Sequence, residues 1–150
     1  MEYTPGGMRV RRMLAGCGIA VAVVALSACT PLKATMADAA AQGRSAVETS
    51  RLLLVVDENG GSGFSVTATA FADALRELNN AVRTVSEADA GSDTESDLRR
   101  DTLDALRAAV DAVEDARGTV HGIGDPDEVV DALEQAGDRL DGLAEAGGAG

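Results

Sequence analysis

Aromatic residues are almost absent from this sequence, which has no Trp, one Tyr and two Phe among its 150 residues. Binding sites for nucleotides and sugars are usually lined in part by aromatic side chains. The scarcity of these side chains therefore weighs against a site of that kind.

Residues that bind transition metals or act as nucleophiles are also scarce. His121 is the only histidine, and Cys17 and Cys29 are the only cysteines. A single histidine cannot form a histidine-rich zinc site, and no recognisable nucleophile motif accompanies it. We therefore expect no catalytic residues, no metal site and no cofactor, and we interpret the chain as a protein that is not an enzyme.

The glycine-rich segment Asp57–Gly63 fits neither a calcium loop nor a phosphate-binding loop. Counted from Asp57, an EF-hand needs Gly at the sixth position and Glu at the twelfth, but these positions are Ser62 and Ala68. No Gly-Lys-Ser/Thr sequence follows the glycine pair, as a phosphate-binding loop would require. We expect this segment to be a connection between helices.

Basic residues are outnumbered, with 13 Lys and Arg against 25 Asp and Glu, which gives a formal net charge of −12. A chain this acidic should avoid nucleic acid and anionic lipid head groups, and it could attract cationic partners. Many acidic residues lie outside the apolar stripes described below, so solvated helix faces explain them. A polyacidic surface for a basic partner is the alternative. Examples of these positions are Asp104, Asp111, Asp115, Asp138 and Asp141.

The N-terminal region has the order of a signal peptide. The basic segment Arg9–Arg12 is followed by the 15 uncharged residues Leu14–Ala28. A membrane-spanning helix needs roughly 20 apolar residues, whereas the core of a signal peptide needs only about 7–15. Met8 begins a more usual signal sequence than Met1 does, so the start of translation stays open between the two.

At the end of this core, Leu26-Ser27-Ala28-Cys29 resembles the lipobox of bacterial lipoproteins, and the resemblance covers residues 8–29. It implies diacylglycerol on the Cys29 thiol, cleavage between Ala28 and Cys29, and attachment to the extracytoplasmic face of the cell membrane through the acyl chains. Cys17 lies inside the apolar core and is expected to be a small apolar residue there. Ordinary secretory cleavage after Ser27 is the alternative.

Removal of residues 1–28 as the signal peptide would leave one domain, residues 29–150, with a lipidated N-terminus. The removed segment carries three Arg and one Glu, so the formal net charge would change from −12 to −14. Cys17 would leave with the signal peptide and Cys29 would be acylated, so no disulfide is expected. The excess of Arg over Lys, with abundant Ala, Asp and Gly, favours a high-GC Gram-positive source.

Apolar residues recur at alternating steps of three and four through the remaining chain, which predicts amphipathic helices. We expect an all-α fold, an antiparallel bundle of three to four helices after the signal peptide. Whether the first helical segment packs in the bundle or serves as a stalk stays open. The expected stripe positions are Met36, Ala40, Gly43 and Val47; Phe64, Ala68, Phe71, Leu75, Leu78, Val82 and Val85; Leu103, Leu106, Val110, Val113, Arg117 and Val120; and Val129, Leu133, Ala136, Leu140 and Leu143.

Local signals predict where the later helices begin and end. Ser92–Glu95 has the sequence of a capping box, and the three glycines in Gly118–Gly124 should end that helix. Asp125 and Pro126 suit the cap and the first position of the last helix. The C-terminal residues 147–150, Gly-Gly-Ala-Gly, should fray.

Five consecutive apolar residues, Leu52, Leu53, Leu54, Val55 and Val56, end the first helical segment. A helix buries only part of its circumference, so such a run predicts either full burial at one end of the bundle or an exposed contact patch. A short buried strand is also conceivable, but the sequence offers no second strand to pair with it. We therefore treat these five residues as a possible contact patch.

The sequence predicts a membrane-anchored extracytoplasmic lipoprotein that acts as a small helical binding or structural module of the cell envelope. Its partner would be an unknown envelope protein or a second copy of the chain, and not nucleic acid. One alternative is an exclusion or immunity lipoprotein that blocks an incoming factor, and another is a small ligand-binding lipoprotein.

Overall fold

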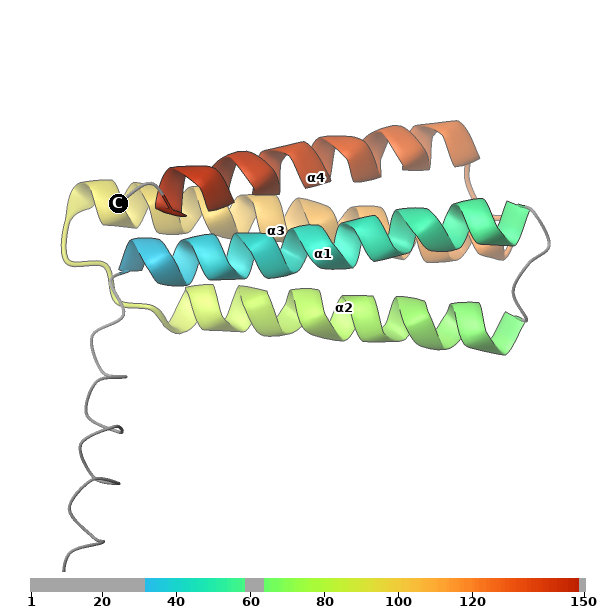
Figure 1. Cartoon of the computed structure of the whole chain (residues 1–150), viewed down its shortest axis with the longest axis horizontal. Helices are drawn as coiled ribbons and strands as arrows, with labels where there is room; N and C mark the ends of the chain where they lie inside the picture. The colour runs from blue at the N-terminus through green and yellow to red at the C-terminus, as the bar shows by residue number, and fades with distance from the viewer. Residues whose placement is uncertain (1–31, 59–63, 149–150) are drawn as a thin grey trace, which may run out of the picture. The chain divides into compact units, whose positions relative to one another are not determined.

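In the computed structural model, residues 32–58 and 64–148 are described, and they form four helices (Figure 1). The expected signal peptide, the lipobox and Cys29 lie outside the described residues. No strand occurs in the two described ranges, so the prediction of an all-α bundle is confirmed. The helices are α1 (Leu32–Glu58), α2 (Phe64–Glu87), α3 (Asp93–Val120) and α4 (Pro126–Gly148).

The start of α3 follows its predicted capping box. Ser92 has extended backbone angles, and its hydroxyl oxygen accepts a hydrogen bond from the Glu95 N–H at 3.3 Å. The Glu95 carboxylate accepts a bond in return, at 2.8 Å, from the N–H of Gly91. In the usual capping box this second bond goes to the capping residue itself. Here the carboxylate reaches one residue further back and satisfies a donor in the preceding loop.

The loop between α3 and α4 also follows its sequence. Gly122 and Gly124 have φ angles of 77° and 92°, which glycine adopts without the strain that other residues would meet. The carboxylate of Asp125 then accepts a hydrogen bond from the Asp127 N–H at 2.9 Å. Pro126 occupies the first position of α4, where its missing N–H leaves no bond unmade.

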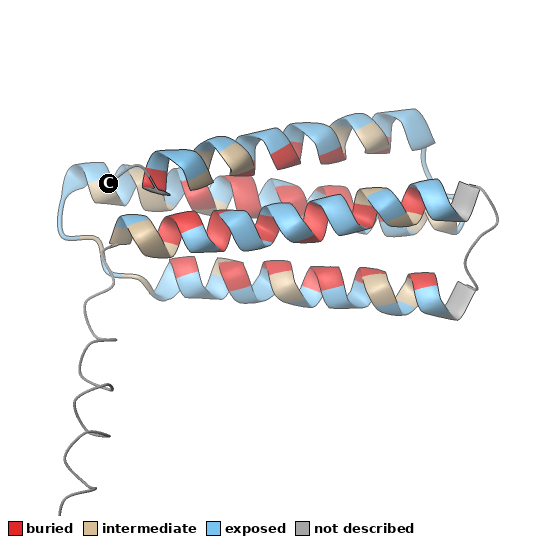
Figure 2. Ribbon diagram, viewed as in Figure 1, coloured by how far each residue is buried: buried red, intermediate tan, exposed pale blue. Residues whose placement is uncertain are grey.

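The first helical segment packs in the bundle as a full member. Helix α1 lies against α2, α3 and α4, whereas α2 and α4 make no close backbone approach within the described ranges. The buried residues of all four helices face one another in a single core (Figure 2). The stalk alternative for this segment is therefore excluded.

Gly43 of α1 lies close to side chains of the other three helices. A Cβ atom at this position would lie 2.6 Å from Leu106 Cδ2 of α3. It would also lie 3.3 Å from Leu140 of α4 and 3.5 Å from Leu78 of α2. One leucine from each of the other helices therefore fills the space that a side chain would need.

The faces of α1 and α4 interlock along their length. Arg44 pairs with Asp141 at 2.6 Å, and Arg51 pairs with Glu134 at 2.5 Å. As residue numbers rise in α1 they fall in α4, so the two pairs define an antiparallel register. Both pairs are partly exposed, so they specify this register more than they stabilise it.

The last turn of α4 packs against the start of α1. The helix continues through Gly148, and Gly147 is buried against the start of α1. A Cβ atom on Gly147 would lie 2.7 Å from the carbonyl oxygen of Lys33. The predicted fraying of residues 147–150 stays a prediction, because residues 149 and 150 lie outside the described residues.

Most of the expected stripe positions are buried. All four in α1 are buried, as are Phe71, Leu75, Leu78 and Val85 in α2 and Val129, Leu133, Ala136 and Leu140 in α4. Ala68, Val82 and Leu143 are half-buried, and the side chain of Phe64 lies outside the described residues.

Only two of the six expected stripe positions of α3 are buried, and Val120 at its end is half-buried. Leu106 and Val113 are fully buried, but Leu103 and Val110 are half-buried and Arg117 is exposed. The buried positions also include Thr102, Ala105, Ala109, Ala112 and Ala116. Small side chains therefore make up most of the buried face of α3, and the larger Leu103 and Val110 lie at its edge.

We expect Gly43→Ala to lower the free energy of unfolding by about 1–3 kcal/mol, the usual cost of overpacking a core. The matched control is Gly142→Ala, because nothing lies within 4 Å of a Cβ at this exposed position of α4. Gly142→Ala should raise stability by up to about 1 kcal/mol through helix propensity alone. Urea unfolding of residues 30–150, followed by circular dichroism, measures both. Effects of the same sign would contradict the packing at Gly43.

A second pair of variants tests which face of α3 is buried. Val113→Asp should cost several kcal/mol because it places an unpaired charge in the core. Val110→Asp should cost much less, since the side chain at the edge of the interface can reach water. If both substitutions lowered the urea midpoint equally, the stripe through Leu103 and Val110 would be the true centre of the interface.

Candidate docking surface

The core of the bundle has no polar group that awaits a ligand. Ser50 and Thr102 are fully buried, and their hydroxyls donate to the carbonyl oxygens of Ala46 at 2.9 Å and Leu98 at 2.8 Å. Within the described part of the chain, every buried side-chain nitrogen or oxygen has a hydrogen-bond partner. No unsatisfied polar group in this part points to an internal site.

Metal-binding groups are dispersed as well. No cluster of three or more His, Cys, Asp or Glu side chains that could hold an ion is found among the described residues. His121 is exposed, and its backbone N–H donates to the Gly118 carbonyl oxygen at 2.9 Å at the end of α3. Of the helices in the described ranges, none has both the length and the apolar character needed to span a bilayer.

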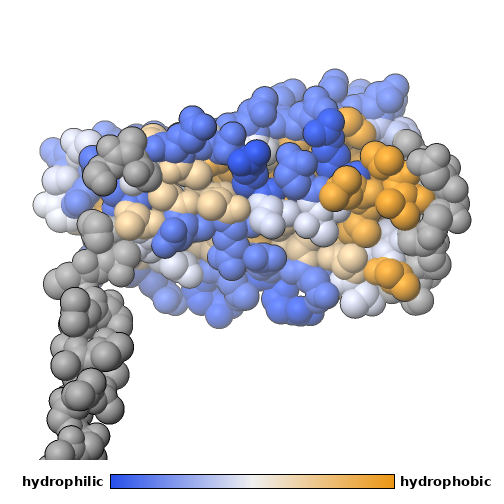
Figure 3. All heavy atoms as spheres, in the orientation of Figure 1, coloured by the Kyte–Doolittle hydropathy of each residue, from blue (hydrophilic) through white to orange (hydrophobic). Residues whose placement is uncertain are grey.

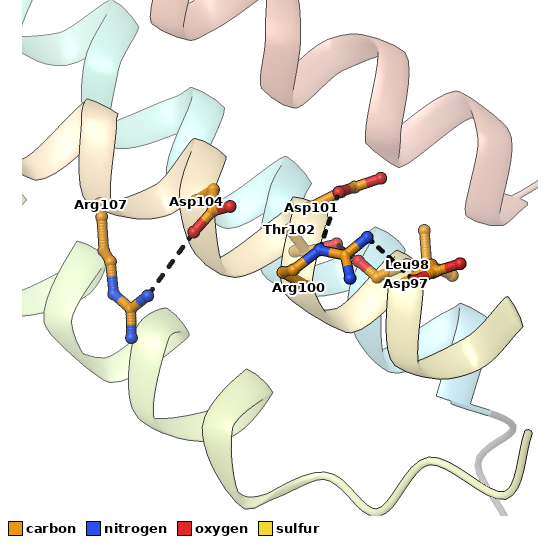
Figure 4. A network of polar contacts seen from close by, with 7 residues as sticks. All are labelled: Asp97, Leu98, Arg100, Asp101, Thr102, Asp104 and Arg107. Atoms are coloured by element: carbon orange, nitrogen blue, oxygen red, sulfur yellow. Dashed lines mark hydrogen bonds and ion pairs between the residues drawn. The ribbon is translucent and has the colours of Figure 1, made fainter. Parts of the chain in front are cut away.

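The acidic helix faces are solvated. On α3, Arg100 lies 2.9 Å from Asp97 and 3.8 Å from Asp101, and Arg107 lies 3.6 Å from Asp104 (Figure 4). These pairs join neighbours on one helix and are exposed, so each contributes little to stability. Of the acidic positions singled out in the sequence, Asp104, Asp111, Asp115 and Asp138 are exposed, and Asp141 is half-buried beside Arg44.

The run of five apolar residues at the end of α1 is only partly buried. Leu54 is in the core and Leu53 is half-buried, but Leu52, Val55 and Val56 are 64%, 50% and 41% exposed. Ser50 and Leu54 face the core, so Leu52 and Val56, each two residues from a core position, lie on the opposite side of the helix. Full burial of this run, one of the two interpretations of the sequence, is wrong.

We call Leu52, Val55 and Val56 the apolar end patch. Their spacing of three and four residues makes them neighbours on the surface of α1. The register set by Arg51 and Glu134 places Val55 opposite the half-buried Val130 of α4. The apolar surface therefore continues from α1 across to α4.

Two more large apolar side chains are exposed at the same end of the bundle. Val66 in the first turn of α2 is 63% exposed, and Ile123 in the loop between α3 and α4 is 68% exposed. Figure 3 shows hydrophobic residues gathered where α1 ends and α2 begins, whereas much of the remaining visible face is hydrophilic. Among the described residues, the exposed large apolar side chains all lie at this end.

Sequence reasoning did not identify Val66, Ile123 or Val130 as members of this surface. Val66 lies off the buried stripe of its helix, and Ile123 stands between two glycines of a loop. An apolar residue in either kind of position is expected to be exposed. Only the up-and-down topology, however, brings these residues to the end of α1.

Together, fold and surface define an up-and-down four-helix bundle with an apolar end and acidic sides. No protein-family model matches the chain, and no significant match to it is found among curated proteins or solved structures. Exposed apolar surface of the kind found at this end usually marks a contact with another molecule.

The exposure of the apolar end patch leads to a direct prediction. Leu52→Gln and Val56→Gln should each change the free energy of unfolding by less than about 0.5 kcal/mol, as surface substitutions usually do. Leu54→Gln, in the same run, should cost at least about 2 kcal/mol because it buries an amide. Urea unfolding of the three variants measures this contrast. A large loss for Leu52→Gln would mean that Leu52 is part of the core.

Proposed function

We propose that this chain is a membrane-anchored lipoprotein of the extracytoplasmic face that acts as a small helical binding module of the cell envelope. The observation that carries the proposal is the order of features at the N-terminus. The basic segment Arg9–Arg12 precedes the 15-residue uncharged core Leu14–Ala28, and the lipobox-like sequence Leu26-Ser27-Ala28-Cys29 stands at the end of that core. Two acyl chains, unlike one, hold a protein stably on a bilayer.

The bundle described above suits display on a membrane. Only Thr30 and Pro31 separate Cys29 from the first residue of α1. An acyl anchor on Cys29 would therefore keep the start of α1 near the bilayer. The apolar end patch begins 20 residues further along the same helix, about 30 Å away at 1.5 Å per residue. It would be presented away from the anchor, where a partner could reach it.

Two more specific roles remain as alternatives to a binding module of the envelope. The exposed apolar end favours a role in which the chain binds a macromolecule. An exclusion or immunity lipoprotein would use the same features, with the incoming factor as its partner. A role in binding a small ligand has less support, because the buried polar groups of the described core are already paired.

The anchor is tested by replacing each cysteine separately. Cys29→Ala should release the protein from the membrane fraction or leave it there with its signal peptide uncleaved, because no thiol remains to accept diacylglycerol. Cys17→Ala should leave fractionation and mass unchanged. Membrane fractionation and intact-mass spectrometry measure both outcomes. Release by Cys17→Ala alone would contradict the assignment of Cys29.

A further inference from the structure

The apolar end patch is bordered by carboxylates that have no ion-pair partner. Glu48 lies one turn before Leu52 on the side of α1 toward α4, where its carboxylate comes 3.8 Å from a Cβ placed on Gly137. Asp127 and Asp131 flank Val130 on α4. All three are exposed, and none forms an ion pair within the described ranges. The nearest cation along α1, Arg51, is already paired with Glu134 at 2.5 Å.

The chain is also strongly acidic from the second half of α3 to the first half of α4, which lead into and out of this end of the bundle. From Asp111 to Glu134, the chain has eight acidic residues, against Arg117 as the only Arg or Lys. A surface of this kind attracts positive charge over about 8–10 Å at physiological ionic strength. The patch therefore combines an apolar centre with a negative border.

A second copy of the chain complements this surface poorly. Two copies would bring the same carboxylates together, and each chain has a formal net charge of −12. Self-association through this end would thus oppose like charges for a small apolar contact.

We propose that the apolar end patch binds a cationic amphipathic helix of another protein. The apolar side of that helix would cover Leu52, Val55 and Val56 along the α1–α4 surface, as an additional helix packed on the bundle. Its Lys and Arg side chains would pair with Glu48, Asp127 and Asp131. The location of this contact at a membrane rests on the proposed function, but the contact itself does not.

Two synthetic helical peptides test the proposal. Both have one leucine stripe, and its flanking positions are all Lys in one peptide and all Glu in the other. The full chain, including its N-terminal segment, is expressed in cells. Protein found in the membrane is purified into zwitterionic nanodiscs, and protein found in the medium is purified from the medium. Fluorescence anisotropy then measures peptide binding, with empty nanodiscs as background. Fractionation is recorded separately, so failure of the anchor is distinguishable from failure of the patch.

We expect the Lys peptide to bind at least tenfold more tightly than the Glu peptide. The triple variant Leu52→Gln/Val55→Gln/Val56→Gln should weaken binding of the Lys peptide at least tenfold, and Leu52→Gln alone severalfold. Circular dichroism of these variants should match the parent, because the three side chains are exposed.

Two double variants that each remove two negative charges test the acidic border, one at the border and one as its matched control. Asp127→Asn/Asp131→Asn should weaken binding of the Lys peptide severalfold and reduce its dependence on salt. Asp138→Asn/Glu145→Gln makes the same change of charge toward the other end of α4 and should alter binding less than twofold. Equal losses from the two double variants would overturn the proposal in favour of unspecific attraction. Equal binding of the two peptides, or a dimer of the parent that the triple variant abolishes, would overturn it as well.

Discussion

The bundle depends on the close approach of its helices at Gly43. Three leucines, one from each other helix, occupy the space beside this residue, and four alanines are among the buried residues of α3. The core has one described aromatic side chain, Phe71, so tight contact between small residues must replace bulk. Dispersion contacts are weak individually and fall off steeply with distance, which makes such a core sensitive to any added methyl group.

The helix ends were predictable from sequence, whereas the centre of the α3 interface was not. Capping at Ser92 and Asp125 depends on neighbours within a few residues, so local sequence contains the information. The buried side of α3 depends on α1, which is more than fifty residues away in the chain. Hydrophobicity selected Leu103 and Val110, but packing against the other helices buries Leu106, Ala109 and the small residues near them instead.

The candidate docking surface was likewise predictable from sequence only in part. The run Leu52–Val56 was recognisable because five apolar residues cannot all face one core, although the sequence did not say which of them would be exposed. Val66, Ile123 and Val130 join this end only through the antiparallel topology. The acidic border likewise depends on the fold, since Glu48 lies on α1 and Asp127 and Asp131 lie on α4, and the antiparallel pairing of Arg51 with Glu134 joins the two helices at this end.

Helix α1 runs without interruption for 27 residues, from the end nearest Cys29 to the apolar end patch. A protein bound at that patch and a lipid anchor at Cys29 would thus be joined by a single covalent helix. Mechanical load between the membrane and the partner would pass along the backbone of α1, parallel to its hydrogen bonds. The contacts of α1 with its three neighbours would then carry little of this load, because both ends of its path lie on α1.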